Sequence, residues 1–260
     1  IAHSRSPELH GHWLRRYGIA GQYVPLRVQP DRLLETLRLL PSLGFAGLNV
    51  TLPHKEAVFA LADSATDRAR AVGAANTLTF EDGHILADNT DGYGFIAALR
   101  QAAGPDAASR PAVVLGAGGA ARGIVAALLD AGAPSVRLVN RTGERADALA
   151  RLFDHRVSTG PWSDPVAETS EPILLVNTTS LGMTGKPPLE IDLNDLKDGS
   201  LVYDIVYTPL ETPLLAAARR RGLVAVDGLG MLLHQAAPGF ERWFGVTPQV
   251  DEELRRAVLG

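Results

Sequence analysis

The chain contains no cysteine, so it can form no disulfide, no thiolate nucleophile and no cysteine-ligated metal site. It also lacks an apolar run near the ~20 residues that a membrane helix needs, and a basic-then-apolar signal segment at its start. These absences favour a cytoplasmic protein without a membrane partner. Because the chain opens at Ile1 rather than at methionine, we expect some of the native N-terminus to precede it.

An excess of positive charge is absent too. The chain has 25 Lys and Arg against 29 Asp and Glu, and its net charge of -4 argues against nucleic acid as a general partner. His10 and His12 have no carboxylate or cysteine cluster beside them, so we expect no metal site. The sequence contains neither a G-x-S-x-G elbow nor an H-E-x-x-H motif, so nothing indicates the hydrolytic chemistry that those motifs carry.

The residues that are present describe a folded α/β protein. The composition is 46% hydrophobic and 21% charged, and 260 residues suit one large domain or two ordinary ones. Helical patterns occur at Asp31–Leu40, Ala120–Ala131 and Thr212–Arg221, and apolar strands at Ala112–Leu115, Val136–Val139, Ile173–Val176, Leu201–Ile205 and Val224–Val226. This alternation predicts a parallel sheet with helices on both faces. The helical pattern at 228–245 is interrupted by Pro238-Gly239, where it either kinks or ends.

A glycine-rich turn is the most informative local signal. In AVVLGAGGAARGIVAALL (112–129), a G-x-G-x-x-A motif at Gly116, Gly118 and Ala121 separates an apolar strand from an amphipathic helix. Small residues permit the tight turn and let the backbone approach a pyrophosphate, while the helix N-terminus favours the anion. A tight turn without a ligand is the alternative, but the strand before and the helix after favour dinucleotide binding.

The end of the next strand bears on which dinucleotide binds. An NAD site usually places Asp or Glu there, whereas this chain has Asn140-Arg141-Thr142 followed by Arg145. Two guanidinium groups one helical turn apart can hold a 2′-phosphate. The alternative is a solvated basic helix start, with an arginine paired to Glu144. The missing carboxylate favours NADP(H).

A lysine occupies an unusual position in GLNVTLPHKEAV (47–58). The pattern predicts a strand over Leu48–Leu52 and then a helix with Pro53 at its first position, so Lys55 lies in the first turn. The helix dipole disfavours a cation there by ~0.3–1 kcal/mol. An exposed lysine tolerates that cost, so the residue is either an ordinary surface residue or a functional one. Serine caps and Asx turns likewise explain Ser4, Ser6 and Asn76 when each is taken singly.

Taken together, the motifs resemble the shikimate dehydrogenase family. The matching segments are IAHSRSPELH, NVTLPHKEAV, GAANTL, DNTDGYGF, VLGAGGAARG, NRTGERA, NTTSLGM, YDIVYTPLETPLL and DGLGMLLHQAA, in the family's order from Ile1 to Ala237. The resemblance implies NADPH-dependent reduction of 3-dehydroshikimate to shikimate, a step of aromatic amino-acid biosynthesis. An apolar strand normally precedes the first motif in this family, which adds to the expectation of an incomplete N-terminus.

The resemblance also implies roles for individual residues. The acid–base pair would be Lys55 and Asp91. The substrate carboxylate would meet Ser4, Ser6 and Tyr207, and the ring hydroxyls would meet Thr51, Asn76 and Gln235. The cofactor residues would be Gly116, Ala117, Gly118, Gly119, Ala120, Asn140, Arg141, Thr142, Arg145, Thr178, Val206 and Gly228. The NTTSLGM loop (177–183) would lie at the carboxyl edge of its sheet, where open α/β sheets bind ligands.

The implied architecture consists of two α/β domains with a cleft between them. Residues 1–98 and 228–260 would form a substrate-binding and catalytic domain, to which the C-terminal helices return, and residues 99–227 a Rossmann-type NADP domain. We expect a monomer or a homodimer. The alternatives are a dehydrogenase acting on quinate or an amino analogue of shikimate, and a non-catalytic regulatory module that binds NADP or a metabolite. Retained Ser6, Arg141 and Arg145 favour the shikimate and NADP type, and the presence of both Lys55 and Asp91 favours an enzyme.

Overall fold

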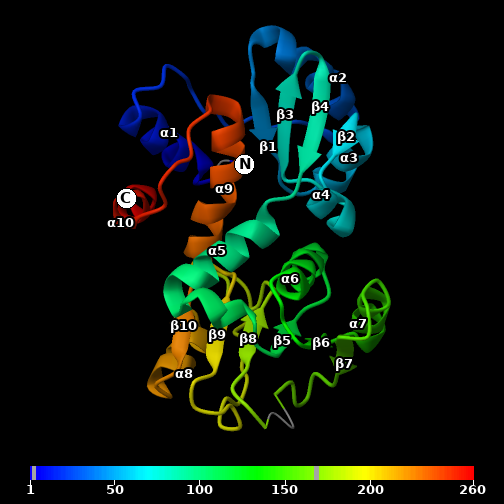
Figure 1. Cartoon of the computed structure of the whole chain (residues 1–260), viewed down its shortest axis with the longest axis vertical. Coiled ribbons are helices and arrows are strands. Elements are labelled where there is room, and N and C mark those ends of the chain that lie inside the picture. Colours follow the sequence, from blue (N-terminus) through cyan, green and yellow to red (C-terminus); the bar gives the residue numbers. More distant parts are fainter. Residues whose placement is uncertain (2–3, 167–169) are drawn as a thin grey trace. The chain divides into compact units, whose positions relative to one another are not determined.

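The computed structural model describes residues 1, 4–166 and 170–260, so Ala2 and His3 of the first motif lie outside the described residues. The chain divides into two compact units (Figure 1). Unit 1 comprises Ile1–Thr90 and Leu233–Gly260, and unit 2 comprises Asp91–Leu232. Among the described residues, no helix combines the length and the apolar character needed to cross a membrane.

Unit 1 is built on a four-stranded mixed sheet of order β1-β3-β4-β2. Its strands are β1 (Gly47–Asn49), β2 (Ser64–Ala65), β3 (Thr77–Glu81) and β4 (His84–Asp88), and only the β2–β4 pair is parallel. Its helical elements are α1 (Ser6–Arg16), η1 (Pro30–Arg32), α2 (Leu33–Leu39), η2 (Leu40–Leu43), α3 (Lys55–Leu61), α4 (Asp67–Val72) and α10 (Glu252–Leu259). Leu37 of α2 and Val58 of α3 pack on Leu78 of β3, which buries one face of this small sheet.

Unit 2 contains a six-stranded, fully parallel sheet of order β10-β9-β8-β5-β6-β7. The strands are β5 (Ala112–Leu115), β6 (Val136–Val139), β7 (Val157–Gly160), β8 (Leu174–Asn177), β9 (Leu201–Asp204) and β10 (Val224–Val226). The helical elements are α5 (Asp91–Ala103), η3 (Pro105–Ala108), α6 (Gly119–Asp130), α7 (Gly143–Ala150) and α8 (Pro213–Arg220), and α9 (Gly228–Phe244) begins here.

Two separate apolar cores lie on the two faces of the unit 2 sheet. Val114 of β5 packs with Leu99 of α5 and Leu128 of α6, whereas its neighbour Val113 packs with Leu215 of α8 on the opposite side. Successive residues of a strand point to opposite faces, so a run of apolar residues marks a strand that is buried on both sides. The predicted fold class, an α/β chain with a Rossmann-type parallel sheet, is therefore confirmed.

The structure corrects several local predictions. The strand predicted over Leu48–Leu52 ends at Asn49, and α3 starts at Lys55 rather than at Pro53, because the amide of His54 bonds to Thr51 O in a separate turn (3.0 Å). The predicted helix 31–40 is divided between η1, α2 and η2. Strand β7 has no apolar run to reveal it, since its Ser158 and Thr159 are polar and exposed at the sheet edge.

Helix α9 settles the question left open at Pro238, because it continues through that residue without ending. A proline inside a helix removes one backbone hydrogen bond. Burial of Ala237 and Phe240 on either side of Pro238 offsets that loss. Helix α5 lies wholly within unit 2, and there Gly92 approaches α6 so closely that a Cβ would lie 2.8 Å from Ala127 Cβ.

Candidate active site

The two serines predicted to receive a carboxylate lie at the start of α1. The amide of Ser6 donates to Ser4 Oγ at 3.3 Å, and Arg5 occupies the N-cap position. The N-cap residue Arg5 forms no side-chain capping bond, so Ser4 Oγ is the side chain that accepts from the first amide of the helix. The capping explanation therefore fits Ser4, whereas Ser6 is itself the first residue of α1. Both serines are partly buried.

Ser6 belongs to a hydrogen-bond chain that runs into the interior of unit 1. Its side chain bonds to the hydroxyl of Tyr23, which donates to Asn49 Oδ1 at 2.8 Å. Burial raises the pKa of Tyr23 to about 12, so this hydroxyl keeps its proton. Asn49 Oδ1 also meets His10 Nε2 at 3.1 Å, and burial lowers the pKa of His10 to about 3. The imidazole is therefore neutral and donates from Nε2.

Asn76 is the centre of the same network. Asn49 Nδ2 donates to Thr77 Oγ1 at 3.2 Å, and Thr77 Oγ1 lies 3.0 Å from Asn76 Oδ1. Asn76 Oδ1 also accepts from the amide and hydroxyl of Thr90, at 2.9 and 3.1 Å, while Asn76 Nδ2 donates to Gln235 Oε1 at 3.1 Å. Buried amides with this many partners have a single orientation. The structure thus brings Ser6, Asn76 and Gln235 into one connected set.

Lys55 and Thr51 lie beside Asn76 through the main chain. The carbonyl of Lys55 accepts from Ala75 N at 2.9 Å, and Val50 N donates to Asn76 O at 2.7 Å. Lys55 is the first residue of α3 and is partly buried, whereas Thr51 is exposed in the turn before it.

Asp91 is the first residue of α5, and unit 2 also begins at this residue. The segment before it is held by Asp88, which accepts from Arg68 Nε at 2.6 Å, Thr66 Oγ1 at 2.7 Å and Asn89 N at 2.7 Å. Burial acts to raise the pKa of Asp88, but the hydrogen bonds from Arg68 and Thr66 outweigh it and lower the pKa. Asp88 is therefore an ionised anchor for the turn that leads to Thr90 and Asp91.

The predicted cofactor residues follow the ends of successive strands in unit 2. Gly116 follows β5, Asn140 follows β6, Thr178 follows β8, Val206 comes just after β9, and Gly228 comes just after β10. Since the strands are parallel and adjacent in the order β10-β9-β8-β5-β6, these residues lie along one edge of the sheet. The chain order reverses between β5 and β8, and open α/β sheets bind ligands at such a point.

The glycine-rich turn has the shape that a pyrophosphate requires. Gly116 has a φ of 111°, and a Cβ there would lie 2.5 Å from Thr178 Oγ1. Among the described residues, no atom lies within 4 Å of the Cβ positions of Gly118 and Gly119, which are exposed. Gly118 is the N-cap of α6 and has no side-chain capping bond. The turn therefore leaves an open cradle at the positive end of a helix, which fits a bound phosphate.

The basic segment after β6 is oriented by its own backbone. Asn140 Nδ2 donates to Thr142 O at 2.8 Å, and Arg145 N bonds to the same carbonyl at 3.1 Å. Arg141 and Arg145 are exposed, and within the described part of the chain neither forms an ion pair, with Glu144 or any other carboxylate. Both guanidinium groups remain available to an anion such as a 2′-phosphate.

The remaining predicted residues divide between the units. Gly228 is tightly enclosed, since its amide donates to Val206 O at 3.2 Å and a Cβ would lie 2.1 Å from Ile205 O. Tyr207 is exposed and belongs to unit 2, as does Asp91, whereas the other predicted substrate residues belong to unit 1. Helix α9 carries both Gly228 and Gln235.

Five residues of the unit 1 network were not predicted from the sequence as site residues, namely His10, Tyr23, Asn49, Thr77 and Thr90. Asn49 stands within the quoted NVTLPHKEAV segment, two residues before Thr51, and that proximity could have identified it. Tyr23 lies in a stretch without helix or strand, and no local pattern indicates its bond to Asn49.

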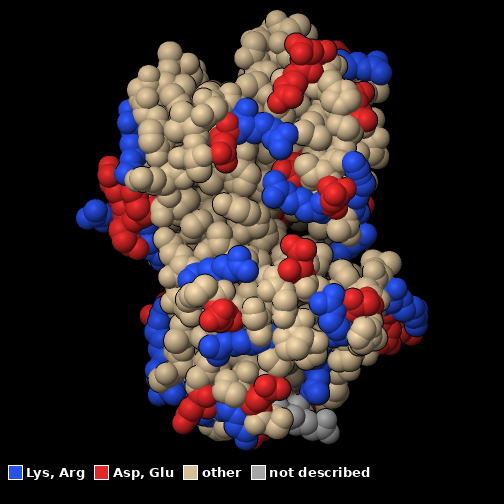
Figure 2. Space-filling model, in the orientation of Figure 1, with Lys and Arg blue, Asp and Glu red and all other residues tan. Residues whose placement is uncertain are grey.

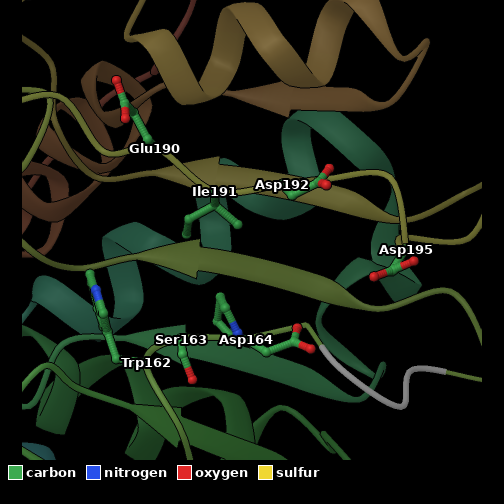
Figure 3. A pocket seen from close by; sticks show the side chains of 8 residues that line it. Trp162, Ser163, Asp164, Glu190, Ile191, Asp192 and Asp195 are labelled. Carbon is green, nitrogen blue, oxygen red and sulfur yellow. The ribbon is translucent and has the colours of Figure 1, made fainter.

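A small pocket of about 100 Å³ in unit 2 is lined by none of the predicted site residues (Figure 3). Its lining is Trp162, Ser163, Asp164, Pro165, Glu190, Ile191, Asp192 and Asp195. Four carboxylates make it unsuitable for an anionic substrate or a phosphate, and it is too small for a dinucleotide. Within the described ranges, no group of three or more His, Asp or Glu side chains is placed to hold a metal ion. On the face that Figure 2 shows, basic and acidic side chains are interspersed.

Three family descriptions match successive parts of the chain. The shikimate dehydrogenase substrate binding domain matches residues 1–78, the shikimate/quinate 5-dehydrogenase family matches residues 98–171, and the shikimate 5′-dehydrogenase C-terminal domain matches residues 228–259. A protein of Paracoccus denitrificans named shikimate dehydrogenase (NADP(+)) is 59% identical, over 100% of this chain and 93% of its own length.

Solved structures agree with these matches. The shikimate 5-dehydrogenase of Thermus thermophilus in complex with NADP(H) and shikimate is 36% identical, with a TM-score of 0.87 over 99% of this chain and 96% of that one. A quinate dehydrogenase of Corynebacterium glutamicum in complex with NAD is 31% identical, with a TM-score of 0.87 over 99% and 94%. The chain belongs to the shikimate dehydrogenase family.

Proposed function

We propose that this protein catalyses the NADPH-dependent, reversible reduction of 3-dehydroshikimate to shikimate, a step of aromatic amino-acid biosynthesis. The observation that carries the proposal is the pairing of two sites in a chain 59% identical to a shikimate dehydrogenase (NADP(+)). Unit 1 supplies a buried polar network at Asn76 and Gln235, and unit 2 supplies an open glycine cradle with two arginines that have no ion-pair partner among the described residues. The absence of cysteine and the biosynthetic role support a cytoplasmic enzyme, acting as a monomer or a homodimer.

Unit 1 would bind most of the substrate. Ser4 and Ser6, with Tyr207, would donate hydrogen bonds to the carboxylate. Asn76 and Gln235 would bind ring hydroxyls together with Thr51, and the bonds between Asn76 and Gln235 hold their amides in place before the ligand arrives. Preorganised groups of this kind lose little freedom on binding. The proposed substrate-binding domain, residues 1–98 and 228–260, comprises unit 1 together with residues 91–98 and 228–232, which belong to unit 2.

Unit 2 would bind the cofactor. The pyrophosphate would occupy the turn of Gly116–Ala120 at the N-terminus of α6, and Asn140, Arg141, Thr142 and Arg145 would hold the adenosine 2′-phosphate. Thr178, Val206 and Gly228 would line the rest of the site. The proposed NADP-binding domain, residues 99–227, is the central part of unit 2, and Gly228 directly follows it. The bound cofactor supplies or accepts the hydride, and the fit of the cradle and the two exposed arginines supports NADP(H).

Lys55 and Asp91 would handle the proton. When a hydride reaches the ketone carbon, negative charge develops on the oxygen, and the Lys55 ammonium would donate a proton to it. In the reverse direction the same amine would accept the proton of the alcohol. Asp91 would be the second member of the acid–base pair, and it directly follows Thr90, which is bonded to Asn76.

The proposal is tested by initial rates at the nicotinamide absorbance band. Purified, folded protein is assayed with shikimate and NADP, with quinate replacing shikimate, and with NAD replacing NADP. We expect rapid turnover in the shikimate–NADP mixture alone. Because a structural relative is a quinate dehydrogenase bound to NAD, turnover with quinate or NAD would change the specificity but keep the chemistry. No turnover in any mixture would contradict the proposed reaction.

A further inference from the structure

Two fully buried polar residues end adjacent strands of unit 2. Asn177 is the last residue of β8 and Asp204 is the last residue of β9, and the two face each other in register. Asn177 Nδ2 donates to Asp204 Oδ1 at 2.9 Å, and both residues are 0% exposed. The proposed function gives neither residue a role, although the loops that follow them carry Thr178 and Val206.

Every hydrogen-bonding atom of the Asn177 side chain is used to shape the loop after β8. Its Oδ1 accepts from Thr179 N at 3.0 Å and from Thr179 Oγ1 at 2.8 Å, and its Nδ2 also donates to Leu181 O at 3.2 Å. Thr179 Oγ1 accepts in turn from Leu181 N at 3.1 Å. The buried side-chain amide of Asn177 therefore fixes the main-chain path of residues 178–181.

Asp204 does the same for the loop after β9. Its Oδ1 accepts from Val206 N at 3.1 Å, and its Oδ2 accepts from Thr212 Oγ1 at 2.7 Å. Burial raises the pKa of Asp204, although the hydrogen bonds from Thr212, Val206 and Asn177 oppose that shift. No cation among the described residues pairs with this carboxylate. A buried acid without a cation is costly for folding alone, which points to a role in geometry.

The strand order indicates which part of the cofactor these loops meet. Arg141 follows β6 and the pyrophosphate cradle follows β5, so the adenosine end of NADP lies on the β6 side of the cradle. The nicotinamide half must then extend in the other direction, over β8 and β9. Gly228 joins the same group, since its amide bonds to Val206 O.

We propose that Asn177 and Asp204 are positioning residues that set the loops of Thr178 and Val206 under the nicotinamide half of the cofactor, without touching cofactor or substrate. This inference rests on the proposed NADP site. Removing the pair should weaken binding of the nicotinamide half and misplace it for hydride transfer, while the adenosine end keeps its contacts.

The experiment measures dissociation constants by calorimetry for two probes. The first is NADP. The second is 2′,5′-ADP, which has the adenosine of NADP with its 2′- and 5′-phosphates but lacks the nicotinamide half. We expect Asn177→Ala to weaken NADP about 10-fold, since loss of a preorganised contact has this order of effect, and to leave 2′,5′-ADP within about 2-fold. The milder Thr179→Val removes only the loop side of the network and should show the same pattern at about 3-fold. Asp204→Asn keeps Oδ1 and can donate to Thr212, so it should retain NADP binding. Exposed Asn194→Ala is the matched control.

Equal weakening of both probes in Asn177→Ala and in Thr179→Val would overturn the inference, because it would indicate general loosening of unit 2. Unchanged NADP binding in Thr179→Val would overturn it as well. Turnover gives a separate readout: kcat should fall in Asn177→Ala while the primary deuterium isotope effect on kcat rises, and KM for shikimate should stay within about 2-fold. If wild-type protein binds NADP but does not oxidise shikimate, the proposed reaction fails and the two binding constants still decide this inference.

Discussion

Lys55 lies at the end of α3 where the helix macrodipole is positive, and its side chain is partly buried. Its carbonyl accepts a hydrogen bond from Ala75, so the residue is tied to the segment that carries Asn76. The helix macrodipole disfavours an ammonium group at this position. The proposed proton transfer gives the lysine a reason to be there.

Replacing Lys55 by alanine should therefore separate activity from stability. We expect Lys55→Ala to lower kcat by roughly 10²–10⁴-fold, the usual contribution of one acid–base group, and to leave the protein folded with a cooperative thermal transition. Steady-state kinetics and a thermal melt of the same preparation measure both. Exposed Lys197→Ala serves as the control and should keep full activity. A Lys55→Ala enzyme with near-normal turnover would remove the lysine from the mechanism.

Arg141 is expected to favour NADP over NAD. Its guanidinium group is exposed, so it is available to the 2′-phosphate, which only NADP carries. We expect Arg141→Ala to weaken NADP by about 10-fold or more, the size of one charge-assisted pair, and to leave NAD almost unaffected. Titration with each cofactor measures the difference. Exposed Arg151→Ala, at the other end of α7, should change neither affinity. Equal losses for NADP and NAD would mean that the basic segment is misassigned.

At the scale of elements, the turn between β5 and α6 combines two different uses of glycine. Gly116 is needed by the protein itself, because its backbone is left-handed and Thr178 occupies the place of a Cβ. Gly118 and Gly119 have no such constraint, since their backbone is ordinary and their surroundings are open among the described residues. The proposed pyrophosphate, which would come close to the backbone, would explain the last two glycines.

Gly118→Ala should accordingly fold normally and bind NADP poorly. A methyl group at the N-cap of α6 meets no described atom of the protein but enters the space expected for the pyrophosphate. We expect a melting temperature within a few degrees of wild type and an NADP affinity about 10-fold lower or worse. Gly143→Ala, at the start of α7 and equally open, is the matched control for folding and should keep the melting temperature of the wild type. If Gly118→Ala binds NADP like the wild type, the phosphate does not occupy this turn.

The elements also show how far the sequence could be interpreted. Strands β5, β6 and β10 were predicted with their observed bounds, because apolar runs mark strands. Strand β7 was missed because an edge strand that is polar on its exposed positions carries no such run. The start of α3 was wrong by two residues, since the pattern of Pro53 suits both a helix start and the turn that precedes it. Contacts such as Tyr23 with Asn49 join segments far apart in sequence, and no local pattern encodes them.

At the scale of the whole chain, unit 1 is discontinuous. Trp13 Nε1 of α1 donates to Gln249 O at 2.9 Å, and Arg16 Nη1 of the same helix reaches Asp251 Oδ2 at 2.7 Å. The first helix is thus completed by the last segment of the chain, and the hydrogen bond of Asn76 with Gln235 also depends on that return. The order of the motifs predicted that the C-terminal segment packs back on the first part of the chain. The residues that hold it there belong to no motif.

The buried imidazole of His10 makes the stability of unit 1 depend on pH. The ring stacks on Tyr23 (4.2 Å between centroids) and also contacts Trp13, Phe240 and Trp243. Its Nδ1 has no hydrogen-bond partner among the described residues, so a proton added there would be buried without an acceptor. Burial accordingly lowers the pKa of His10 to about 3 from its ordinary 6.5, against a weaker opposing effect of the bond to Asn49.

Because the folded pKa is depressed, the unfolded chain binds one more proton than the folded chain between pH 6.5 and about 3. The contribution of the neutral His10 to the free energy of unfolding of unit 1 is fully present above pH 6.5. Below that pH, the free energy of unfolding should fall by about 1.4 kcal/mol per pH unit. The depressed carboxylates Asp88 and Asp251 add losses only at lower pH, near and below ~4. Burial lowers the pKa of His234 as well, which acts in the same direction as His10.

Urea unfolding at pH 7, 6 and 5 measures this slope. With Trp162→Phe as the background, the fluorescence of Trp13 and Trp243 reports on unit 1. We expect His10→Gln to be less stable at pH 7, because it loses the aromatic contacts, but to lose much less stability between pH 6 and 5 than the background protein does. Exposed His84→Gln, in the same unit, should keep the full slope. A slope in His10→Gln as steep as in the background would show that another group takes up the proton, and His234→Gln would then be the variant to compare.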